Sequence, residues 1–573
     1  MKMKLSYSTI PFLLWALLYP LANTAYADTS HVDINFLLNS KTHPYFLKPY
    51  TDKEHETLKE LYQLNKSQLL WFSVKHPVHT INQLLELYTN ASTQGLNSAD
   101  YASQYLKYQW QKLQQNNPGF HEFAIFDTAL SLTFLRYLND LHYGRINPNQ
   151  LGFGLPEKNI INFASHIYGA IQINAISALT ERMEPKLIAY QQLKQTLEKY
   201  RRLNQHFDQT VHFNFEQTLY PGDWSTQISE LEYYLDALNT PINQAIVAKT
   251  ETSNTYTPGI AAKVRNLQTN HNLTSDGIIG KQTLEALNTP LNKRIEQIEL
   301  AMERLRWLPE QQKGRFILVN IPAFQLWAYN TGQKHGDMLN MKVVVGKAKN
   351  KGKEKSRDKA LQTPVFTANL SYLVFNPYWN IPKNILTEEI LPLVEKKTDY
   401  LQNHNMEIVS QFSHQATALP INEENINRLY SGQLHLRQRP GPGNALGHIK
   451  FIFPNNYNVY LHDTPALSLF NRQQRDFSHG CIRVENPSKL AIFALQEQPE
   501  WDDTKIQSAM TSNEPSIVDL KQTIPVLIFY TTTLVTKTGT VFYPDIYNHD
   551  SILQSALVER SQLLAIPTVA TKL

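Results

Sequence analysis

The stretch FSHGCIRV, residues 477–484, holds the only cysteine of the 573-residue chain. A free cysteine usually packs as a small buried hydrophobe, so a core residue without a chemical role is the alternative interpretation. The neighbours of Cys481 indicate another use, because His479, Arg483 and backbone amides flanked by glycine all favour a thiolate over a thiol. The thiolate is the nucleophilic form of cysteine, and the stretch therefore predicts a nucleophile at Cys481.

A second stretch, YLHDTP at residues 460–465, ends an apolar-rich run that is typical of a strand. His462 lies 19 residues before the cysteine, so one reversal of the chain would bring its imidazole to the sulfur. A lone histidine at a strand end is more often structural. Paired with this cysteine, His462 is predicted to be the base that takes the thiol proton.

These residues carry a family resemblance. His462 followed by Ser478-His479-Gly480-Cys481 and Arg483 resembles the signature of L,D-transpeptidases with a YkuD-type catalytic domain. Three further stretches resemble the large, multidomain YcbB-like branch of that family: RQRPGPGNALG (437–447), FNPYWNIP (375–382) and MERLRWLP (302–309). The resemblance covers most of the chain after its first residues.

Composition agrees with an ordinary soluble globular protein of three or four domains, with 42% hydrophobic and 18% charged residues. The formal net charge of +4 is small, and no basic block or basic-aromatic interleaving is present. The chain therefore has no nucleic-acid signature.

Residues 1–27 read as a secretory signal peptide, with two lysines, a short apolar centre and Ala25-Tyr26-Ala27 as a cleavage site. An uncleaved anchor is the alternative, although the apolar centre is shorter than the roughly 20 residues that span a bilayer. We expect a periplasmic protein, close to the membrane only through this segment. A single cysteine has no partner for an internal disulfide, which in an oxidising compartment also favours a functional thiol.

Two helical regions precede the β-rich part of the chain. Up to about residue 220 the pattern is helical without catalytic spacing, and the resemblance implies a scaffold domain; a spacer without activity is the reading from the residues alone. Residues 221–290 predict three short helices around a turn at 276–280. This unit resembles a type 1 peptidoglycan-binding domain, with a structural spacer as the alternative. The Thr- and Ser-rich linker at 247–258 is expected to be mobile.

From residue 315 the pattern changes to strands, which favours a β-rich sandwich or barrel. A segment at about 383–432 interrupts the strands with a helix broken near Pro392. We predict that this insertion is a cap over the cysteine, because long insertions in compact domains are often lids.

The predicted fold class is multidomain α+β: a helical scaffold and a three-helix module, followed by a β-rich YkuD-type domain with a helical cap. The predicted segments are a signal peptide (1–27), a helical scaffold (28–220), a peptidoglycan-binding-like module (221–290), a connecting helix (291–312), a catalytic domain (313–545) and a C-terminal tail (546–573).

Several residues receive candidate roles. Ser478, His479 and Gly480 join Cys481 and His462 in the catalytic group, and the amides of Gly480 and Cys481 are the candidate oxyanion donors. The group that orients His462 is either the backbone carbonyl or the carboxylate of Asp463, which stands where the family often has glycine. Further candidates bind substrate: Arg483 as a carboxylate clamp, with a salt bridge to Glu485 as its alternative, and Tyr378, Trp379 and Asn444 as lining of the cleft, with core packing as theirs.

The resemblance implies acyl transfer in the cell wall, with peptidoglycan stem peptides as partners. The thiolate would attack a tetrapeptide stem between diaminopimelate and the terminal D-Ala, and a diaminopimelate amine of another stem would resolve the thioester into a 3→3 cross-link. Water as acceptor would make the protein an L,D-carboxypeptidase, and a non-catalytic wall-binding protein is a second alternative. A papain-like protease is disfavoured, because there the cysteine precedes the histidine.

No cofactor is expected. His462, His479 and Cys481 could in principle form a zinc site, but zinc usually takes three or four protein ligands and the single cysteine leaves few. A lipoprotein acceptor is left open, and an active thiolate is expected to be acylated by a carbapenem.

Overall fold

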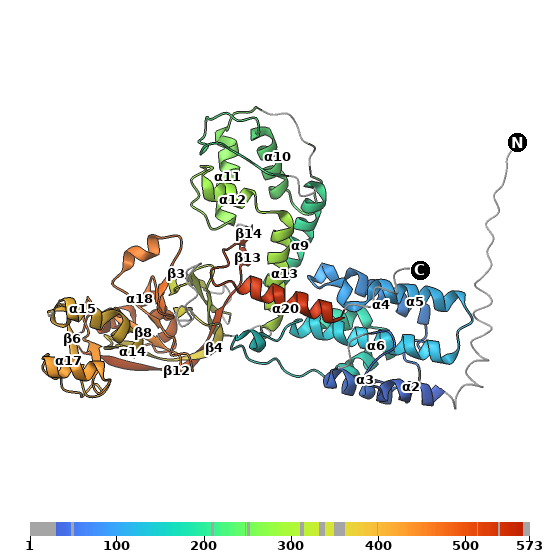
Figure 1. Cartoon of the computed structure of the whole chain (residues 1–573), viewed down its shortest axis with the longest axis horizontal. Helices are drawn as coiled ribbons and strands as arrows, with labels where there is room; N and C mark the ends of the chain where they lie inside the picture. The colour runs from blue at the N-terminus through green and yellow to red at the C-terminus, as the bar shows by residue number, and fades with distance from the viewer. Residues whose placement is uncertain are drawn as a thin grey trace.

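The computed structural model describes residues 30–46, 51–207, 211–246, 248, 253–309, 314–331, 338–348, 361–397, 399–512, 514–536 and 539–564. The predicted signal peptide lies outside these residues, as does part of the linker predicted at 247–258. Figure 1 shows an elongated molecule with the N-terminal helices at one end, a β-sheet toward the other end with the unit of α14, α15 and α17 beyond it, and a small helical module beside the middle. None of the described helices combines the length and the apolar composition of a membrane-spanning segment.

The scaffold is a helical domain built around α6, which is buried along most of its length. Asp127 within α6 is buried and accepts hydrogen bonds from the main-chain nitrogens of Leu70 and Trp71, both at 2.8 Å. These bonds fix an irregular loop against the central helix, because a buried carboxylate must be hydrogen-bonded. The helices of this region are α2 (Ser30–Asn39), α3 (Asp52–Leu64), α4 (Pro77–Thr89), α5 (Ser103–Gln115), α6 (Phe120–Tyr143), α7 (Phe163–Gln172), α8 (Ile176–Met183) and α9 (Ile188–Phe207), with short 3-10 turns η1 (Asn90–Gln94), η2 (Ser98–Tyr101) and η3 (Pro148–Leu151).

The small module contains three helices, α10 (Ile228–Asn239), α11 (Pro258–Asn270) and α12 (Lys281–Leu287), around its own apolar core. The turn predicted at 276–280 is present and is held by the buried Gln268, whose amide nitrogen lies 2.8 Å from Asp276 Oδ1 and whose oxygen lies 2.8 Å from the Gly277 nitrogen. Gly277 has a φ of 76°, and a Cβ there would meet Arg265 Nη1 at 2.8 Å. Both the backbone angle and the space therefore require glycine.

Helix α13 (Leu291–Trp307) joins the three regions and packs along α9 to form the stem that carries the module. Its last turns belong to the stretch MERLRWLP and bury three charged residues, Glu303, Arg304 and Arg306. Glu303 accepts from Arg306 Nη1 at 2.9 Å and from the main chain of Ile146 at 3.0 Å, so it ties the scaffold to α13. The stretch is thus a buried polar joint between regions, and each charge has a partner from another part of the fold.

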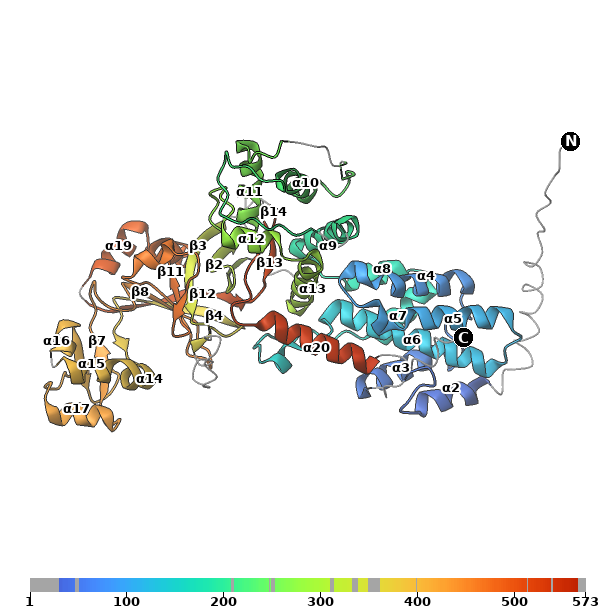
Figure 2. The same cartoon turned by 45° about the horizontal axis from the view of Figure 1, so that its top comes forward.

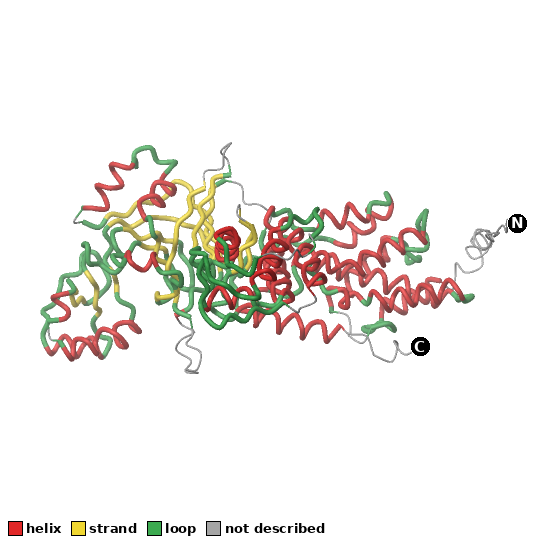
Figure 3. Tube along the Cα trace, turned by 90° about the horizontal axis from the view of Figure 1, so that it is seen from above, coloured by secondary structure: helices red, strands yellow, loops and turns green. Residues whose placement is uncertain are grey.

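The β-rich region forms one sheet whose strand order is β10-β3-β11-β9-β8-β4-β12-β1-β2, and an additional pairing of β2 with β3 closes the ring of pairings. Figure 3 shows most of the strands, in yellow, gathered between the long helical region and the helices and loops at the opposite end of the molecule. The strand expected from the apolar-rich run that ends in the stretch 460–465 contains only Leu461 and His462, and Asn458 just before it adopts a φ of 56° in a turn. The strands are β1 (Arg315–Asn320), β2 (Gln325–Asn330), β3 (Met338–Gly346), β4 (Phe366–Phe375), β8 (Ile449–Ile452), β9 (Leu461–His462), β10 (Asp476–Ser478), β11 (Ile482–Val484) and β12 (Ser516–Phe529); helices α18 (Pro487–Leu495) and α19 (Asp503–Thr511) and turn η6 (Leu467–Asn471) lie between them.

The insertion has its own core and its own three-stranded sheet, β5-β7-β6. The helix expected to break near Pro392 is interrupted just before it by a π-helical turn. We call the unit from β5 to β7 the cap. Its elements are β5 (Trp379–Asn380), α14 (Lys383–Ile385), the π turn η5 (Leu386–Ile390), α15 (Leu391–Lys396), α16 (Tyr400–Asn403), β6 (Met406–Val409), α17 (Glu423–Tyr430) and β7 (His435–Gln438).

The segment predicted as a C-terminal tail, 546–573, is in part a helix. After the hairpin β13 (Thr533–Thr536) and β14 (Gly539–Phe542), α20 (His549–Leu564) runs back to the scaffold, as Figures 1 and 2 show. Arg560 on this helix donates to Asp100 at 3.0 Å and to Asp140 at 2.6 Å. Its helical pattern is weak because few of its residues are buried, while its ion pairs are specific.

Candidate active site

One face of the closed sheet carries a row of polar residues, and the other face packs into the core. Register pairs Lys450 on β8 with His462 on β9, and pairs His462 with Arg483 on β11. Residues paired in this way point to the same side of the sheet. The alternate positions, including Leu461 and Ile482, belong to the apolar core. Strand alternation therefore places the three cationic or basic side chains on one surface.

Cys481 and Tyr460 extend this row by one position. Each lies two residues before a member of the row, so each points to the same face where the strands continue. The pairing does continue, because the Ile482 nitrogen donates to the Tyr460 carbonyl at 3.1 Å. Cys481 and His462 are thus diagonal neighbours on adjacent parallel strands. The register therefore puts the predicted nucleophile and the predicted base on the same face of the sheet.

The thiol of Cys481 lies 3.7 Å from the carbonyl oxygen of Asn458. Burial raises the pKa of this thiol, while hydrogen bonds from Tyr460 and the positive charges of Lys450 and Arg483 act in the opposite direction. Burial dominates, so the resting site holds a neutral thiol rather than the stable thiolate expected from the sequence. Ionisation must therefore accompany the reaction, with a base to take the proton.

His462 is buried, and its ring has a fixed orientation. Its Nδ1 lies 2.5 Å from the carbonyl oxygen of Asp463; since a carbonyl only accepts, Nδ1 carries the proton and Nε2 has the lone pair. The Asp463 carboxylate accepts instead from the main-chain nitrogens of His448 at 2.8 Å and Thr464 at 2.7 Å. Of the two alternatives left open by the sequence, the backbone carbonyl is the group that bonds the imidazole.

The charge state of His462 suits a base. Burial lowers its pKa to about 3, the charges of Arg483 and Lys450 shift it in the same direction, and the bond to Asp463 opposes the shift. The imidazole is therefore neutral at neutral pH and able to accept a proton at Nε2. With a raised thiol pKa and a lowered imidazole pKa, the free site is a neutral pair.

The loop before Cys481 is held by a short chain of hydrogen bonds. Ser478 Oγ donates to the carbonyl of Cys481 at 2.5 Å and accepts from the Gly480 nitrogen at 3.2 Å. Thr363 Oγ1 donates to the Gly480 carbonyl at 2.8 Å. Gly480 has a φ of 110°, a conformation that only glycine adopts readily. Ser478 and Gly480 thus shape the turn that presents the sulfur.

These bonds correct one expectation. The Gly480 amide was expected to donate to a developing oxyanion, but it is engaged by Ser478 Oγ. The Cys481 amide has no hydrogen-bond partner within the described part of the chain and remains available. Of the two candidate oxyanion donors, the Cys481 amide is therefore free, whereas the Gly480 amide would have to turn away from Ser478 to donate.

The side chain of His479 contacts the cap. Its Nε2 lies 2.5 Å from Glu389 Oε1, within the π-helical turn η5. Single π turns occur frequently at functional sites, and here the turn directs a carboxylate at the catalytic loop. The structure thus joins the cap to the loop that carries the cysteine.

Arg483 has no acidic partner among the residues that the structure describes. The alternative partner, Glu485, instead lies 3.8 Å from Lys342 Nζ and accepts from the Lys342 main chain. The Nε of Arg483 is buried without a hydrogen bond. An arginine left in this state on the site face has its donors available for an incoming carboxylate.

The remaining predicted cleft residues have structural contacts of their own. The Asn444 side chain is buried and donates to the carbonyls of Pro377 at 3.1 Å and Arg439 at 2.9 Å. The Tyr378 ring lies under the Arg437 guanidinium, 4.0 Å from its centre, and Trp379 packs against the cap core. These contacts support the connection between cap and sheet, so direct contact with substrate stays a prediction for all three residues.

The sequence interpretation missed Lys450, Tyr460, Thr363 and Glu389. Lys450 and Tyr460 were detectable in principle, because both stand at alternate positions on the strands that lead to the predicted base. Thr363 and Glu389 could not be recognised from the sequence, because both are far from Cys481 along the chain and only the folded structure brings them to the cysteine loop.

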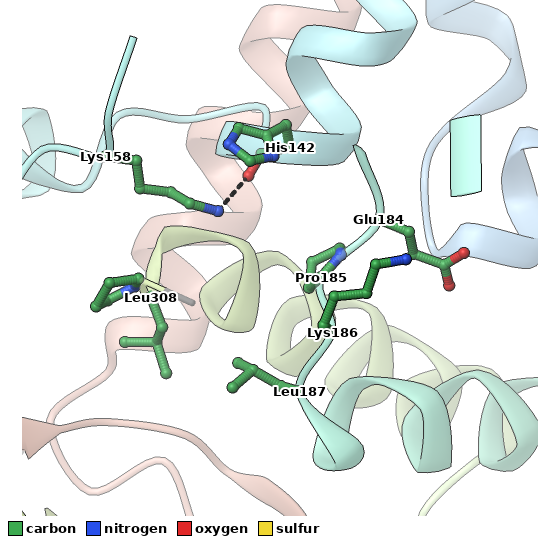
Figure 4. A pocket seen from close by; sticks show the side chains of 8 residues that line it. His142, Lys158, Glu184, Pro185, Lys186, Leu187 and Leu308 are labelled. Carbon is green, nitrogen blue, oxygen red and sulfur yellow. Dashed lines mark hydrogen bonds between the residues drawn. The ribbon is translucent and has the colours of Figure 1, made fainter. Parts of the chain in front are cut away.

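Two cavities lie outside this site, and neither is a better candidate for binding a substrate. Figure 4 shows a pocket between the scaffold and the end of α13, where Lys158 Nζ donates to the His142 carbonyl at 2.8 Å. Its volume is about 10 Å³, at most the room of one water. A larger cavity of about 300 Å³ lies beside Arg145 and Arg201, each of which already faces a carboxylate.

Comparisons with known protein families agree with this geometry. Residues 314–503 match the L,D-transpeptidase catalytic domain (YkuD), residues 56–197 match a scaffold domain, and residues 225–287 match the "Putative peptidoglycan binding domain". The chain thus contains a YkuD L,D-transpeptidase catalytic domain, which holds the Cys481–His462 pair, and a domain of the peptidoglycan-binding type. The expected fold class is confirmed: a helical N-terminal region, the small module and a β-rich YkuD domain.

A curated relative from Haemophilus influenzae, named "Putative L,D-transpeptidase", is 31% identical over 283 residues, which are 48% of this chain. The chain spans 54% of the length of that relative. Among solved structures, the L,D-transpeptidase of Xylanimonas cellulosilytica is 13% identical, with 56% of this chain and all of that chain covered and a TM-score of 0.16. A fused Zn-dependent amidase/peptidase/peptidoglycan-binding protein of Clostridium acetobutylicum is 9% identical, with 55% and 99% covered and a TM-score of 0.14. Scores this low carry no argument.

Proposed function

We propose that the protein is a cysteine-dependent L,D-transpeptidase that forms 3→3 cross-links in peptidoglycan. One observation supports the proposal most directly: the YkuD domain match covers Cys481 and His462, and the sheet register sets both on one face. The nucleophile, an oriented neutral imidazole and a backbone amide beside the sulfur are the parts that acyl transfer through a thioester requires.

In the first half-reaction, His462 Nε2 takes the thiol proton as the sulfur attacks the carbonyl carbon between diaminopimelate and the terminal D-Ala of a donor tetrapeptide. The carbon–nitrogen bond breaks, D-Ala leaves with the proton from the imidazolium, and a thioester to Cys481 forms. The Cys481 amide supports the oxyanion, and Arg483 binds a carboxylate of the stem.

In the second half-reaction, the side-chain amine of diaminopimelate on another stem attacks the thioester carbon. His462 takes a proton from this amine, the carbon–sulfur bond breaks, and the thiol is restored by the same proton. The product is a 3→3 cross-link. No step in this cycle uses a cofactor.

The rest of the chain would bring this site to the cell wall. The module at 225–287 is proposed to bind peptidoglycan, and the multidomain architecture supports a place in the YcbB-like branch. We also propose export to the periplasm through the signal peptide at 1–27. The cap is proposed to close over the donor stem, which excludes water from the thioester.

Incubation of the purified full chain with tetrapeptide muropeptides, followed by mass spectrometry, tests the proposal. The expected products are released D-Ala and dimers joined between diaminopimelate residues. Tripeptide without dimers would instead show an L,D-carboxypeptidase, and unchanged tetrapeptide would leave wall binding as the function.

Two controls separate the outcomes. Cys481→Ala is expected to abolish every product while the protein still folds. Retention by isolated sacculi, compared between the full chain and a chain lacking residues 221–290, tests the binding role of the module independently. Equal retention would remove that role.

A further inference from the structure

Lys450 is a cation without a counter-ion in the middle of the site. It lies on β8, is paired in register with His462, and is only partly exposed. Within the described ranges, its ammonium group has no carboxylate as an ion-pair partner and donates no hydrogen bond, and it lies over an aromatic ring instead. A half-buried lysine usually has such a partner, so this position needs an explanation.

The ammonium group of Lys450 contacts an aromatic ring. Lys450 Nζ lies 3.9 Å from the centre of the Tyr460 ring, which is a cation–π contact at close range. Tyr460 in turn lies close enough to Cys481 for each group to shift the pKa of the other. The contacts therefore run from Lys450 through the tyrosine to the nucleophile.

The charged side chains around the sulfur are positive. Lys450 from β8 and Arg483 from β11 are positive, while Tyr460 and His462 from the intervening strand are neutral. The nearest carboxylate in sequence, Asp463, is bonded to backbone nitrogens, and His479 on the preceding loop faces Glu389. A negative sulfur would thus meet two fixed cations and no neighbouring carboxylate.

This arrangement has a chemical consequence. Fixed cations stabilise a thiolate, and the same cations oppose protonation of His462, as burial does. The usual cysteine–histidine pair needs an imidazolium to hold the thiolate. Here, lysine and arginine supply that positive charge, and the imidazole can pass its proton on without losing the charge balance.

We propose that Lys450 is a positioning residue that holds the Tyr460 ring beside the sulfur and supplies fixed positive charge against which Cys481 ionises as its proton passes to His462. The inference rests on the proposed role of Cys481 as nucleophile. It adds a residue to the site that neither the motif nor the histidine indicates.

The single cysteine makes the test direct, because alkylation of the full chain reports Cys481 alone. The rate of modification by iodoacetamide, a neutral probe, is measured from pH 6 to pH 11 for the wild type and for Lys450→Met. We expect Lys450→Met to shift the titration midpoint upward, and one pKa unit would slow alkylation at neutral pH about tenfold. An unchanged midpoint would overturn the proposal.

Conservative and matched variants separate charge from structure. Lys450→Arg keeps the charge and is expected to retain most of the wild-type rate; a rate as low as that of Lys450→Met would contradict the charge role. Lys342→Met removes an exposed lysine on β3 and is expected to leave the titration unchanged. Circular dichroism melting checks folding, and Lys450→Gln replaces Lys450→Met if the apolar variant does not fold.

The outcome is independent of cross-linking, because iodoacetamide needs no donor stem. A chain that titrates as expected but makes no dimers would refute the proposed transpeptidase reaction and keep the role of Lys450. If the wild type makes dimers but Lys450→Met does not shift the titration midpoint, the transpeptidase reaction is supported and the role of Lys450 is refuted.

Discussion

The Nε2 of His479 lies 2.5 Å from Oε1 of Glu389, which joins the catalytic loop to the cap through a single side-chain bond. The cap otherwise has its own core and its own sheet, so it can move as a unit. His479 stands two residues before the nucleophile. The position of the cap and the conformation of the loop are thus coupled at this contact.

Glu389→Ala is expected to loosen the cap. Both side chains are partly exposed, so the pair contributes about 1 kcal/mol or less to stability. Hydrogen exchange should rise across 383–396, and acylation of Cys481 by a donor stem should slow several-fold. The adjacent Glu388→Ala is the control, since Glu388 is exposed and has no such bond in the described structure. Unchanged exchange in Glu389→Ala would contradict the coupling.

Asp463→Asn separates the two possible roles of this residue. The carbonyl that bonds His462 remains, whereas the carboxylate loses one of its two backbone donors because an amide group offers only one acceptor oxygen. We expect a stability loss of about 1–3 kcal/mol in urea unfolding, with acylation reduced less than tenfold. His462→Gln, by comparison, should lose about 100-fold or more. A loss for Asp463→Asn as large as that for His462→Gln would assign the orienting role to the carboxylate.

Thr363→Val should disturb the cysteine loop from a distance. The hydroxyl donates to the Gly480 carbonyl and accepts from the Gly346 nitrogen, both at 2.8 Å, so its loss leaves two buried groups without a partner. We expect a loss of about 1–3 kcal/mol in stability and slower acylation. Thr533→Val is the matched control, because the buried Thr533 hydroxyl has no hydrogen-bond partner among the described residues and its removal should be nearly neutral. Equal effects of the two substitutions would be evidence against the anchoring role.

Acid should destabilise the fold through buried neutral histidines. Burial lowers the pKa of His549 to about 3, so between pH 6.5 and pH 3 the unfolded chain binds the extra proton and stability falls as pH falls. The slope is roughly 1.4 kcal/mol per pH unit for such a group. Asp127, whose pKa burial raises to about 6, gives an opposite slope between about pH 4 and 6.

His549→Phe removes one of these groups without leaving an unsatisfied partner, since the His549 Nδ1 has none. The urea midpoint of this variant, measured at pH 7, 6 and 5, should fall less steeply with acid than that of the wild type. His212→Gln changes an exposed histidine and should follow the wild type. Parallel curves for His549→Phe and the wild type would show that His549 is not the titrating group.

The sequence predicted the architecture well where periodicity reports burial. The helices of the module, the break before Pro392 and most strands of the sheet appear close to their expected positions. The short strands β10 and β11 around Cys481 were missed, because three residues are too few for alternation to be recognised. Helix α20 was missed for a different reason, since its attachment depends on Arg560 pairing with carboxylates far away in the chain.

The candidate residues of the site could be recognised from the sequence, whereas the charge states of their side chains could not. Cys481 and His462 can be recognised from the sequence because a cysteine and a histidine are separated by 19 residues, enough for one reversal of the chain. The sheet register puts both residues on one face. Their protonation states depend on burial and on Lys450 and Arg483, which only the closed sheet assembles. Likewise, the engagement of the Gly480 amide depends on one side-chain rotamer, that of Ser478.

The central claim is that Cys481 forms a covalent bond to the donor stem after His462 takes its proton. The most direct measurement is the intact mass of the full chain, quenched in acid seconds after mixing with tetrapeptide muropeptide. We predict a mass increase equal to the donor less D-Ala, located at Cys481, strongly reduced in His462→Gln and absent in Cys481→Ala. Products formed without any adduct on Cys481, or an adduct that forms equally fast in His462→Gln, would contradict the account.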